Sequence, residues 1–260
     1  MKLSYTTVSI AGKLNFDESV KLAKETGCAG LEFRTGNIFP HGIEVSLTKE
    51  ARKEKRRIIE DNYLEIACLN SEFMLHNPDA AERAKIIEGA VRTAELAADL
   101  GCKRVRVFGN DIPKGVNAQD CVNYVGDTLA EIAGRAAPMN VDILLEMHGQ
   151  FNYWGYTLPA VQRADRPNTG ILYNCDTRDL VGGSVRETFS RVKNHVRHIH
   201  MHNIGEYPYV ELFTELIHMG YDGYLSAEID ASDDPVRVLK LHNECVRVMY
   251  ELAGFLAVRR

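Results

Sequence analysis

The chain has 260 residues, of which 45% are hydrophobic and 26% are charged, and its net charge is −5. This composition is typical of soluble globular proteins and argues against a disordered tail, while the net negative charge argues against a general nucleic-acid-binding or anionic-membrane-binding surface. The length is compatible with one large domain or with two small ones.

Short β-type runs alternate with longer helical stretches along the whole sequence. The expected strands are Leu3–Ile10, Ala29–Phe33, Leu64–Leu69, Arg104–Phe108, Val141–Met147, Gly170–Cys175, Val196–Met201 and Gly223–Ile229. The expected helices are Phe16–Thr26, Leu47–Asp61, Asp79–Leu100, Asp120–Ala136, Leu158–Ala164, Val185–Lys193, Tyr209–Met219 and Pro235–Ala253. Strands that alternate with helices predict a parallel sheet with the helices packed outside it.

Eight strand–helix units in a chain of this length predict an α/β fold of the (β/α)8 TIM barrel type, a parallel eight-stranded barrel with outer helices, formed as a single domain over residues 1–260. A doubly wound open sheet is the alternative, but its phosphate-binding signatures GxGxxG and GxxxxGK[ST] do not occur. Three helices are followed directly by a glycine, namely Gly27, Gly101 and Gly220. A glycine there can adopt the left-handed conformation that ends a helix and turns the chain into the next strand.

The cysteines and the N-terminal segment bear on the cellular setting. The six cysteines include no CxxC pair, so we expect reduced, buried thiols in a cytoplasmic protein. Ser4, Thr6, Thr7 and Ser9 interrupt the N-terminal segment, and no run approaches the ~20 apolar residues of a membrane span. Neither a signal peptide nor membrane insertion is therefore expected.

The fifth expected strand shows a strict two-residue alternation. Val141, Ile143, Leu145 and Met147 fall on one face, and Asp142, Leu144, Glu146 and His148 fall on the other. We expect the apolar face to pack on the outer helices and the other face to point into the barrel, with Glu146 and His148 at its C-terminal end. A carboxylate inside a barrel is costly unless it is paired or binds a cation.

Four successive strands carry an ionisable group near their C-terminal ends, where barrel enzymes place their active sites. These groups are Glu146, Asp176, His200 and Glu228. Three carboxylates and one imidazole predict a site for one divalent metal ion, with Mn²⁺, Mg²⁺, Co²⁺ and Zn²⁺ all compatible. Such an ion stabilises an enediolate, and carboxylates on opposite walls could remove and return a proton.

The seventh strand offers three histidines on one face. Among them His200 is the preferred metal ligand. His198 is expected to lie deeper, as a hydrogen-bonded barrel residue, and His202 lies at the mouth, where it could contact substrate or be solvated.

These segments resemble the xylose-isomerase-like TIM barrels, the group of sugar phosphate isomerases and epimerases, over nearly the whole chain. Four motifs carry the resemblance: LEMHG at Leu145–Gly149, the aspartate Asp176, HIHMHN at His198–Asn203, and GYDGYLSAE at Gly220–Glu228. They are similar to the family's E-x-H segment, its strand-six aspartate, its H-x-H-x-K-D segment and its G-Y-x-G-x-x-x-x-E ending.

The resemblance implies a specific assignment of roles. One metal ion would be held by Glu146, Asp176, His200 and Glu228, and the two glutamates would be the catalytic acid/base pair, with His148 near the substrate oxygens. Glu32 would help to order the site or would form a structural salt bridge inside the barrel. The implied activity is isomerisation or epimerisation of a small sugar, keto-sugar or sugar phosphate, and the family suggests a homo-oligomer.

Other residues could contact the carbohydrate. The aromatic segment after the fifth strand, which includes Trp154, could form a lid or stacking wall, or simply pack over the barrel mouth. Arg178 and Arg34 could bind a phosphate or a carboxylate.

Two segments depart from the family's pattern. The strand-six pattern D-x-x-H reads DTRD here, so that Asp179 replaces the histidine, and the strand-seven Lys-Asp is His202-Asn203. The barrel rims also lack the extra histidines of the trinuclear zinc endonucleases of this family, which argues against that branch. Two alternatives stay open: a metal-dependent dehydratase of the inosose or 3-dehydroshikimate type, and a non-catalytic sugar-binding homologue.

Overall fold

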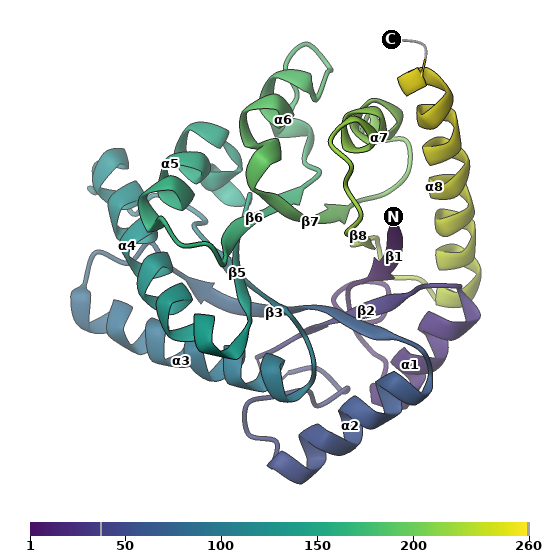
Figure 1. Cartoon of the computed structure of the whole chain (residues 1–260), viewed down its shortest axis with the longest axis horizontal. Coiled ribbons are helices and arrows are strands. Elements are labelled where there is room, and N and C mark those ends of the chain that lie inside the picture. Colours follow the sequence, from purple (N-terminus) through teal and green to yellow (C-terminus); the bar gives the residue numbers. More distant parts are fainter. Residues whose placement is uncertain (37, 259–260) are drawn as a thin grey trace.

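Eight parallel strands surround the centre of the molecule (Figure 1). In the computed structural model, which describes residues 1–36 and 38–258, they are β1 (Lys2–Tyr5), β2 (Gly30–Arg34), β3 (Glu65–Met74), β4 (Arg104–Phe108), β5 (Asp142–Glu146), β6 (Thr169–Asn174), β7 (Val196–Met201) and β8 (Tyr224–Ala227). Each strand from β2 to β7 pairs with the next one in the chain, and β8 pairs with β1.

The contact between β1 and β2, which we call the seam, closes the barrel wall with fewer hydrogen bonds than the other pairs of neighbouring strands. The N–H of Ala29 donates to the carbonyl of Leu3 at 2.8 Å, and the N–H of Thr7 donates to the carbonyl of Glu32 at 3.0 Å. A parallel bridge also joins Thr6 to Glu32. The predicted (β/α)8 barrel is therefore confirmed, and the doubly wound open sheet is excluded.

In the part of the chain that the structure describes, eight α-helices pack around the outside of the strands (Figure 1). They are α1 (Phe16–Glu25), α2 (Lys49–Asp61), α3 (Ala80–Asp99), α4 (Ala118–Ala136), α5 (Trp154–Ala164), α6 (Arg186–Val192), α7 (Tyr209–His218) and α8 (Pro235–Val258). Gly27, Gly101 and Gly220 have φ values of +70°, +76° and +69°, which is the left-handed helix end expected from the sequence.

Several element boundaries differ from the sequence prediction: β3 continues to Met74 and α8 to Val258, and two other differences bear on the site. The first strand ends at Tyr5 rather than at Ile10, and a series of turns follows it. The fifth helix begins at Trp154, four residues before the predicted Leu158, so Trp154 belongs to a helix and not to a loop. Pro159 lies inside this helix and made the sequence signal for its start weak.

The interior of the barrel is polar at the level of the candidate site. Glu32, Asn70, Arg106, His198 and His200 are at most 1% exposed. The outward-facing residues of the same strands are apolar and buried under the helices, as the alternation predicts. The barrel therefore contains charged groups that must satisfy one another, because water does not reach them.

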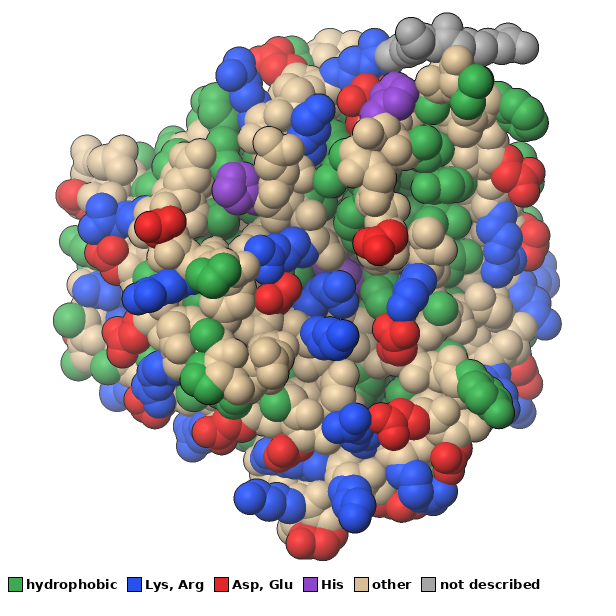
Figure 2. Space-filling view, in the orientation of Figure 1, with side chains coloured by type: hydrophobic (Ala, Val, Ile, Leu, Met, Phe, Trp, Pro, Cys, Tyr) green, Lys and Arg blue, Asp and Glu red, His purple; other side chains and the backbone are tan. Residues whose placement is uncertain are grey.

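Two further sequence predictions concern thiols and membranes. All six cysteines are free; five are buried, and Cys245 on α8 is half-buried. Within residues 1–36 and 38–258, none of the helices combines the length and the apolar character that crossing a membrane requires. Basic and acidic side chains are interspersed over the face shown in Figure 2.

Candidate metal site

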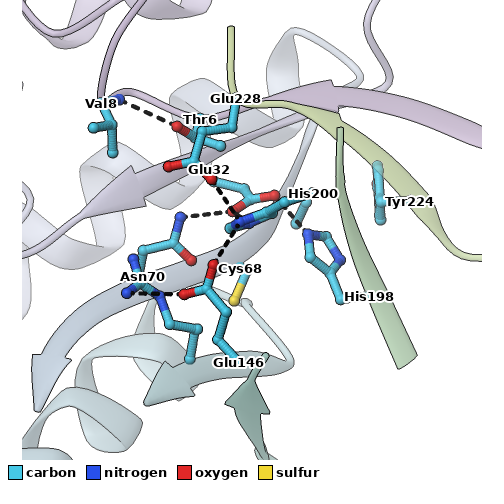
Figure 3. A network of polar contacts seen from close by, with 12 residues as sticks. Thr6, Val8, Glu32, Cys68, Asn70, Glu146, His198, His200, Tyr224 and Glu228 are labelled. Atoms are coloured by element: carbon cyan, nitrogen blue, oxygen red, sulfur yellow. Dashed lines mark hydrogen bonds and ion pairs between the residues drawn. The ribbon is translucent and has the colours of Figure 1, made fainter. Parts of the chain in front are cut away.

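Three predicted ligands from three strands meet inside the barrel mouth (Figure 3). His200 Nδ1 lies 3.3 Å from Glu146 Oε1 and 3.0 Å from Glu228 Oε2. Strand register explains the meeting, because His200 pairs with Ser226 in the β7–β8 ladder and Glu228 follows Ser226 by two residues on the same face. One atom from each of the three side chains lies within 4.8 Å of the others.

The other side of the His200 ring is held by Glu32. His200 Nε2 lies 3.0 Å from Glu32 Oε2, and His198 Nε2 lies 2.5 Å from Glu32 Oε1. The side-chain amide of Asn70 donates to Glu32 Oε2 at 2.7 Å. Glu32 therefore contacts both histidine rings through fully buried ion pairs in the barrel interior. Burial alone would raise its pKa, but His198 and His200 outweigh this and hold the pKa of Glu32 well below its usual range.

This arrangement fixes the direction in which His200 offers a lone pair. Because the Nε2–H donates to Glu32, a neutral His200 points the Nδ1 lone pair at two carboxylate oxygens. Three such acceptors lie close together when a proton sits on Nδ1 or when a metal cation lies among them. Burial would lower the pKa of His200, but Glu32, Glu228 and Glu146 outweigh it and raise that pKa well above its usual value.

The donor set fits a divalent metal ion. Glu146 Oε2 and His200 Nδ1 are buried polar atoms that have ion-pair contacts but no well-aligned hydrogen bond among the described residues. Two carboxylate oxygens and one imidazole nitrogen suit Mn²⁺, Mg²⁺, Co²⁺ or Zn²⁺. Within the described part of the chain, Glu146, His200 and Glu228 could hold such an ion directly. Glu32, His198 and His200 form a second group with suitable atoms, but these residues already pair with one another.

Arg106 on β4 belongs to the same site, although the sequence reasoning did not single it out. Its Nη1 lies 3.2 Å from Glu146 Oε2, and its guanidinium lies over the Phe108 ring at 3.9 Å from the ring centre. Burial would raise the pKa of Glu146, but Arg106 and then His200 lower it below its usual value. The available signal was an arginine in the middle of a buried strand, which is rare unless an anion accompanies it.

The structure does not bring Asp176 into the group formed by Glu146, His200 and Glu228. Its carboxylate accepts hydrogen bonds from Arg178 Nε at 2.9 Å and from Arg178 Nη2 at 2.5 Å, and the backbone N–H of Arg178 donates to Oδ1 at 2.9 Å. The side chain of Asp176 is 21% exposed and that of Arg178 is 58% exposed. This ion pair therefore lies at the open rim, next to the cluster.

The two rim histidines have polar partners that fix their rings. His202 Nε2 lies 2.7 Å from Asn174 Oδ1, and His202 Nδ1 lies 3.2 Å from the backbone carbonyl oxygen of Glu228. His148 Nδ1 lies 2.9 Å from Asn110 Oδ1. His202 is thus directly beside Glu228, whereas His148 belongs to the β4–β5 side of the mouth.

Trp154 and Asp179 lie beside the mouth rather than in the cluster. Both line a cavity of about 430 Å³ together with Arg178. The guanidinium of Arg191 lies 5.2 Å from the centre of the Trp154 ring. Asp179, at the position of the family's histidine, accepts hydrogen bonds from the Tyr207 hydroxyl at 3.0 and 3.1 Å and is buried.

Comparison with known proteins places the chain in a family. A family model described as xylose isomerase-like TIM barrel matches residues 20–247. A 2-oxo-tetronate isomerase of Pectobacterium atrosepticum is 22% identical over 231 residues, which are 82% of this chain and 86% of that protein. A 2-oxo-tetronate isomerase of Cupriavidus necator is 26% identical over 152 residues, 53% of this chain and 58% of that protein, so the match spans less than two thirds of this relative.

Solved structures share the fold. An L-ribulose 3-epimerase has a TM-score of 0.83 and 16% identity, covering 98% of this chain and 96% of its own. The IOLI protein, solved with a binding zinc atom, has a TM-score of 0.78 and 16% identity, covering 97% and 98%. The match of the family model over most of the sequence shows that this chain belongs to the xylose isomerase-like TIM barrel family.

Proposed function

We propose that this protein is a divalent-metal-dependent isomerase or epimerase of a small sugar, keto-sugar or sugar phosphate. One observation carries the proposal: Glu146 at the end of β5 and Glu228 just after β8 approach the same nitrogen of His200. The names of the relatives, two 2-oxo-tetronate isomerases and an L-ribulose 3-epimerase, support the reaction class. The zinc atom in the IOLI structure supports a metal cofactor.

Glu146, His200 and Glu228 would hold the ion, and Asp176 is proposed as a fourth ligand once its carboxylate leaves Arg178. The ion would supply Lewis acidity, which lowers the free energy of a substrate oxygen that gains negative charge. Glu32 keeps the Nε2 proton of His200 in place, so that the Nδ1 lone pair stays available to the site.

The two glutamates would move the proton. Glu228 is 22% exposed and faces the mouth, whereas Glu146 is 3% exposed and lies against Arg106. A carboxylate that contacts the carbon next to a carbonyl can remove its proton, and the same or the opposite carboxylate can return a proton to give the product. Return to the neighbouring carbon is isomerisation, and return to the opposite face is epimerisation.

The remaining rim residues would bind the substrate's hydroxyl and anionic groups. His202 is next to Glu228 and would donate to a substrate hydroxyl in place of Asn174 Oδ1, and His148 is placed on the β4–β5 side. Arg178 is the rim cation best placed for a phosphate or carboxylate, because more than half of its side chain is exposed. Trp154 lines the cavity beside the mouth and would contact the far end of a longer carbohydrate.

Metal analysis and proton exchange test this proposal. Purified protein should contain close to one divalent ion per chain by elemental analysis. A panel of ketoses and short 2-keto acids should exchange one carbon-bound proton for deuterium in D₂O, followed by NMR. Glu146→Gln and Glu228→Gln should abolish the exchange, whereas Glu95→Gln, on an exposed position of α3, should not.

Three outcomes would contradict the proposal. Full exchange in both glutamine variants would show that these carboxylates do not carry the proton. Loss of water from the substrate, with a new conjugated absorbance, would assign a dehydratase instead. Binding of sugars without metal and without exchange would assign a non-catalytic homologue.

A further inference from the structure

The outer side of α8 carries a row of exposed apolar side chains. Leu241, Val248, Leu252 and Phe255 are 65%, 64%, 48% and 72% exposed, and the half-buried Cys245 lies between the first two. Consecutive members of this row are separated alternately by four and three residues. That spacing places them on one narrow stripe of a helix and is the spacing of a coiled-coil seam. We call these five residues the α8 stripe.

The barrel does not need this stripe for its own packing. Leu239, Val246 and Ala253 are fully buried and attach another face of α8 to the rest of the molecule. The helix packs between α7 and α1, and its outer side faces away from the strands (Figure 1). In Figure 2, hydrophobic side chains gather along the α7–α8 side of the molecule. An apolar stripe of this kind, left in water, indicates a partner.

The charged residues beside the stripe indicate what the partner is. Lys240, Glu244, Arg247 and Glu251 lie along one flank and alternate in sign. When two α8 helices run antiparallel across a twofold axis between Cys245 and Val246, Lys240 of one copy lies opposite Glu251 of the other. The same axis places Glu244 opposite Arg247. The charges of this flank therefore complement those of a second copy only when the two α8 helices run antiparallel.

The ion pairs within one copy leave two of these charges available. Glu244 and Arg247 pair with each other along the helix. Lys240 and Glu251 form no ion pair within the described part of the chain, and both are exposed. A second copy would supply a partner for each of them.

The surface on the other flank of the stripe is also apolar. A groove of about 610 Å³ lies between α7, α8 and the β7–α7 loop, and Ile204, Met249 and Leu256 line it. Ile204 and Leu256 are 37% and 42% exposed. A helix of 24 residues is about 36 Å long, so a strip about 10 Å wide offers about 360 Å². A stable interface buries about 800 Å² per partner, so this groove must contribute to it.

We propose that a second copy of this chain covers the α8 stripe, with the two α8 helices antiparallel across a twofold axis near Cys245. Each copy contributes the same patch, which consists of the stripe, the charged flank and the apolar groove. This interface is independent of the chemistry proposed for the barrel mouth.

Sedimentation velocity and a charge-swap series test the interface. The wild-type protein should be a dimer at concentrations of about 10 µM and above. Lys240→Glu should raise the dissociation constant by about tenfold, because two like-charge contacts replace two ion pairs. The double variant Lys240→Glu/Glu251→Lys should restore the wild-type constant. Leu252→Glu should raise it by at least about a hundredfold, with an unchanged far-ultraviolet circular dichroism spectrum.

Cysteine cross-linking tests the direction of the helices. Cys245 is the one thiol that is not buried, and the proposed axis passes beside it. A short bis-maleimide should produce a covalent dimer from the wild type and none from Cys245→Ser. A wild-type monomer at about 100 µM would overturn the proposal. So would a dimer that is insensitive to Leu252→Glu, a double variant weaker than Lys240→Glu, or a dimer without a cross-link.

Discussion

Two parts of the barrel rim behave differently. At β7 and β8, His200 and Glu228 point inward and meet Glu146 from β5. At β6, Asp176 turns to Arg178, two residues further along the chain. Glu146 and His200 lie on strands, and Glu228 follows β8 on the inward face. Asp176 instead caps a 3₁₀ turn, and its carboxylate accepts a hydrogen bond from the backbone N–H of Arg178 in that turn. Strand register thus fixes side-chain direction up to the end of the ladder, and local capping decides it beyond that point.

The largest expected effect comes from the β8 side. Glu228→Gln should lower kcat by about 10²–10⁴-fold, because an amide cannot accept the proton. The exchange assay in D₂O measures this effect, and the metal content measured in parallel shows whether the ion stays bound. Activity within about threefold of the wild type would contradict the role of Glu228. Glu95→Gln on α3 serves as the matched control.

The β6 side should show its effect in stability and pH. Burial raises the pKa of Asp179 from 3.8 to about 7, and the charge of Asp176 adds to this effect. Hydrogen bonds from Tyr173 and Tyr207 oppose the shift but do not cancel it. The folded protein therefore binds a proton that the unfolded chain releases, so Asp179's contribution to stability falls as pH rises from about 4 to 7. Asp179→Asn should remove this loss, worth about 2–4 kcal/mol at pH 8. Urea unfolding at pH 5 and pH 8 measures it, and equal pH dependence in both proteins would refute it.

A substitution of Glu32 tests whether this residue positions His200 for metal binding. Glu32→Gln should weaken metal binding by about 10–100-fold, because the amide no longer holds His200 through a charge-assisted hydrogen bond. Competition titration with a chelating indicator measures this affinity. Glu65→Gln, which changes an exposed carboxylate paired with Lys2, is the control and should leave the affinity unchanged. Equal affinities for the two variants would remove Glu32 from the positioning role.

The smallest effects should come from the Asp176–Arg178 pair, and they sharpen the comparison. Asp176→Asn should weaken metal binding by about tenfold if the carboxylate can reach the ion. Arg178→Ala should tighten it by a few-fold, because it frees that carboxylate, and should raise KM for phosphorylated substrates. The same titration measures both affinities. Unchanged affinity in both variants would mean that Asp176 only forms the rim ion pair.

Much of this site follows from periodicity in the sequence. The two-residue alternation predicts that Glu146 and His200 point inward, because both lie on strands whose other face is apolar and buried. The direction of Asp176 did not follow, because it depends on an arginine two residues away and on a turn that begins at the aspartate itself. Arg106 was missed because Arg104 and Arg106 look like the polar face of an exposed strand until the register shows that this face is the barrel interior.

Trp154 shows a similar limit. Its position next to Tyr153 and close to other aromatic residues suggested a loop over the mouth, yet α5 begins at this residue. Helix starts without a capping side chain give no local signal, and Tyr153 forms no side-chain cap here. The boundaries that the sequence predicted well, such as the ends at Gly27, Gly101 and Gly220, are those with a residue whose conformation is diagnostic.

The weak seam of the barrel has a consequence for how the site forms during folding. The side chain of Glu32 contacts His200. The backbone carbonyl of the same residue accepts the hydrogen bond that joins β2 to the segment after β1. Closure of this seam therefore also fixes the position of Glu32 relative to His200. Partly folded forms that lack the β1–β2 closure would not bind the ion in the same way, so an ion bound here would stabilise the complete barrel against opening at that seam.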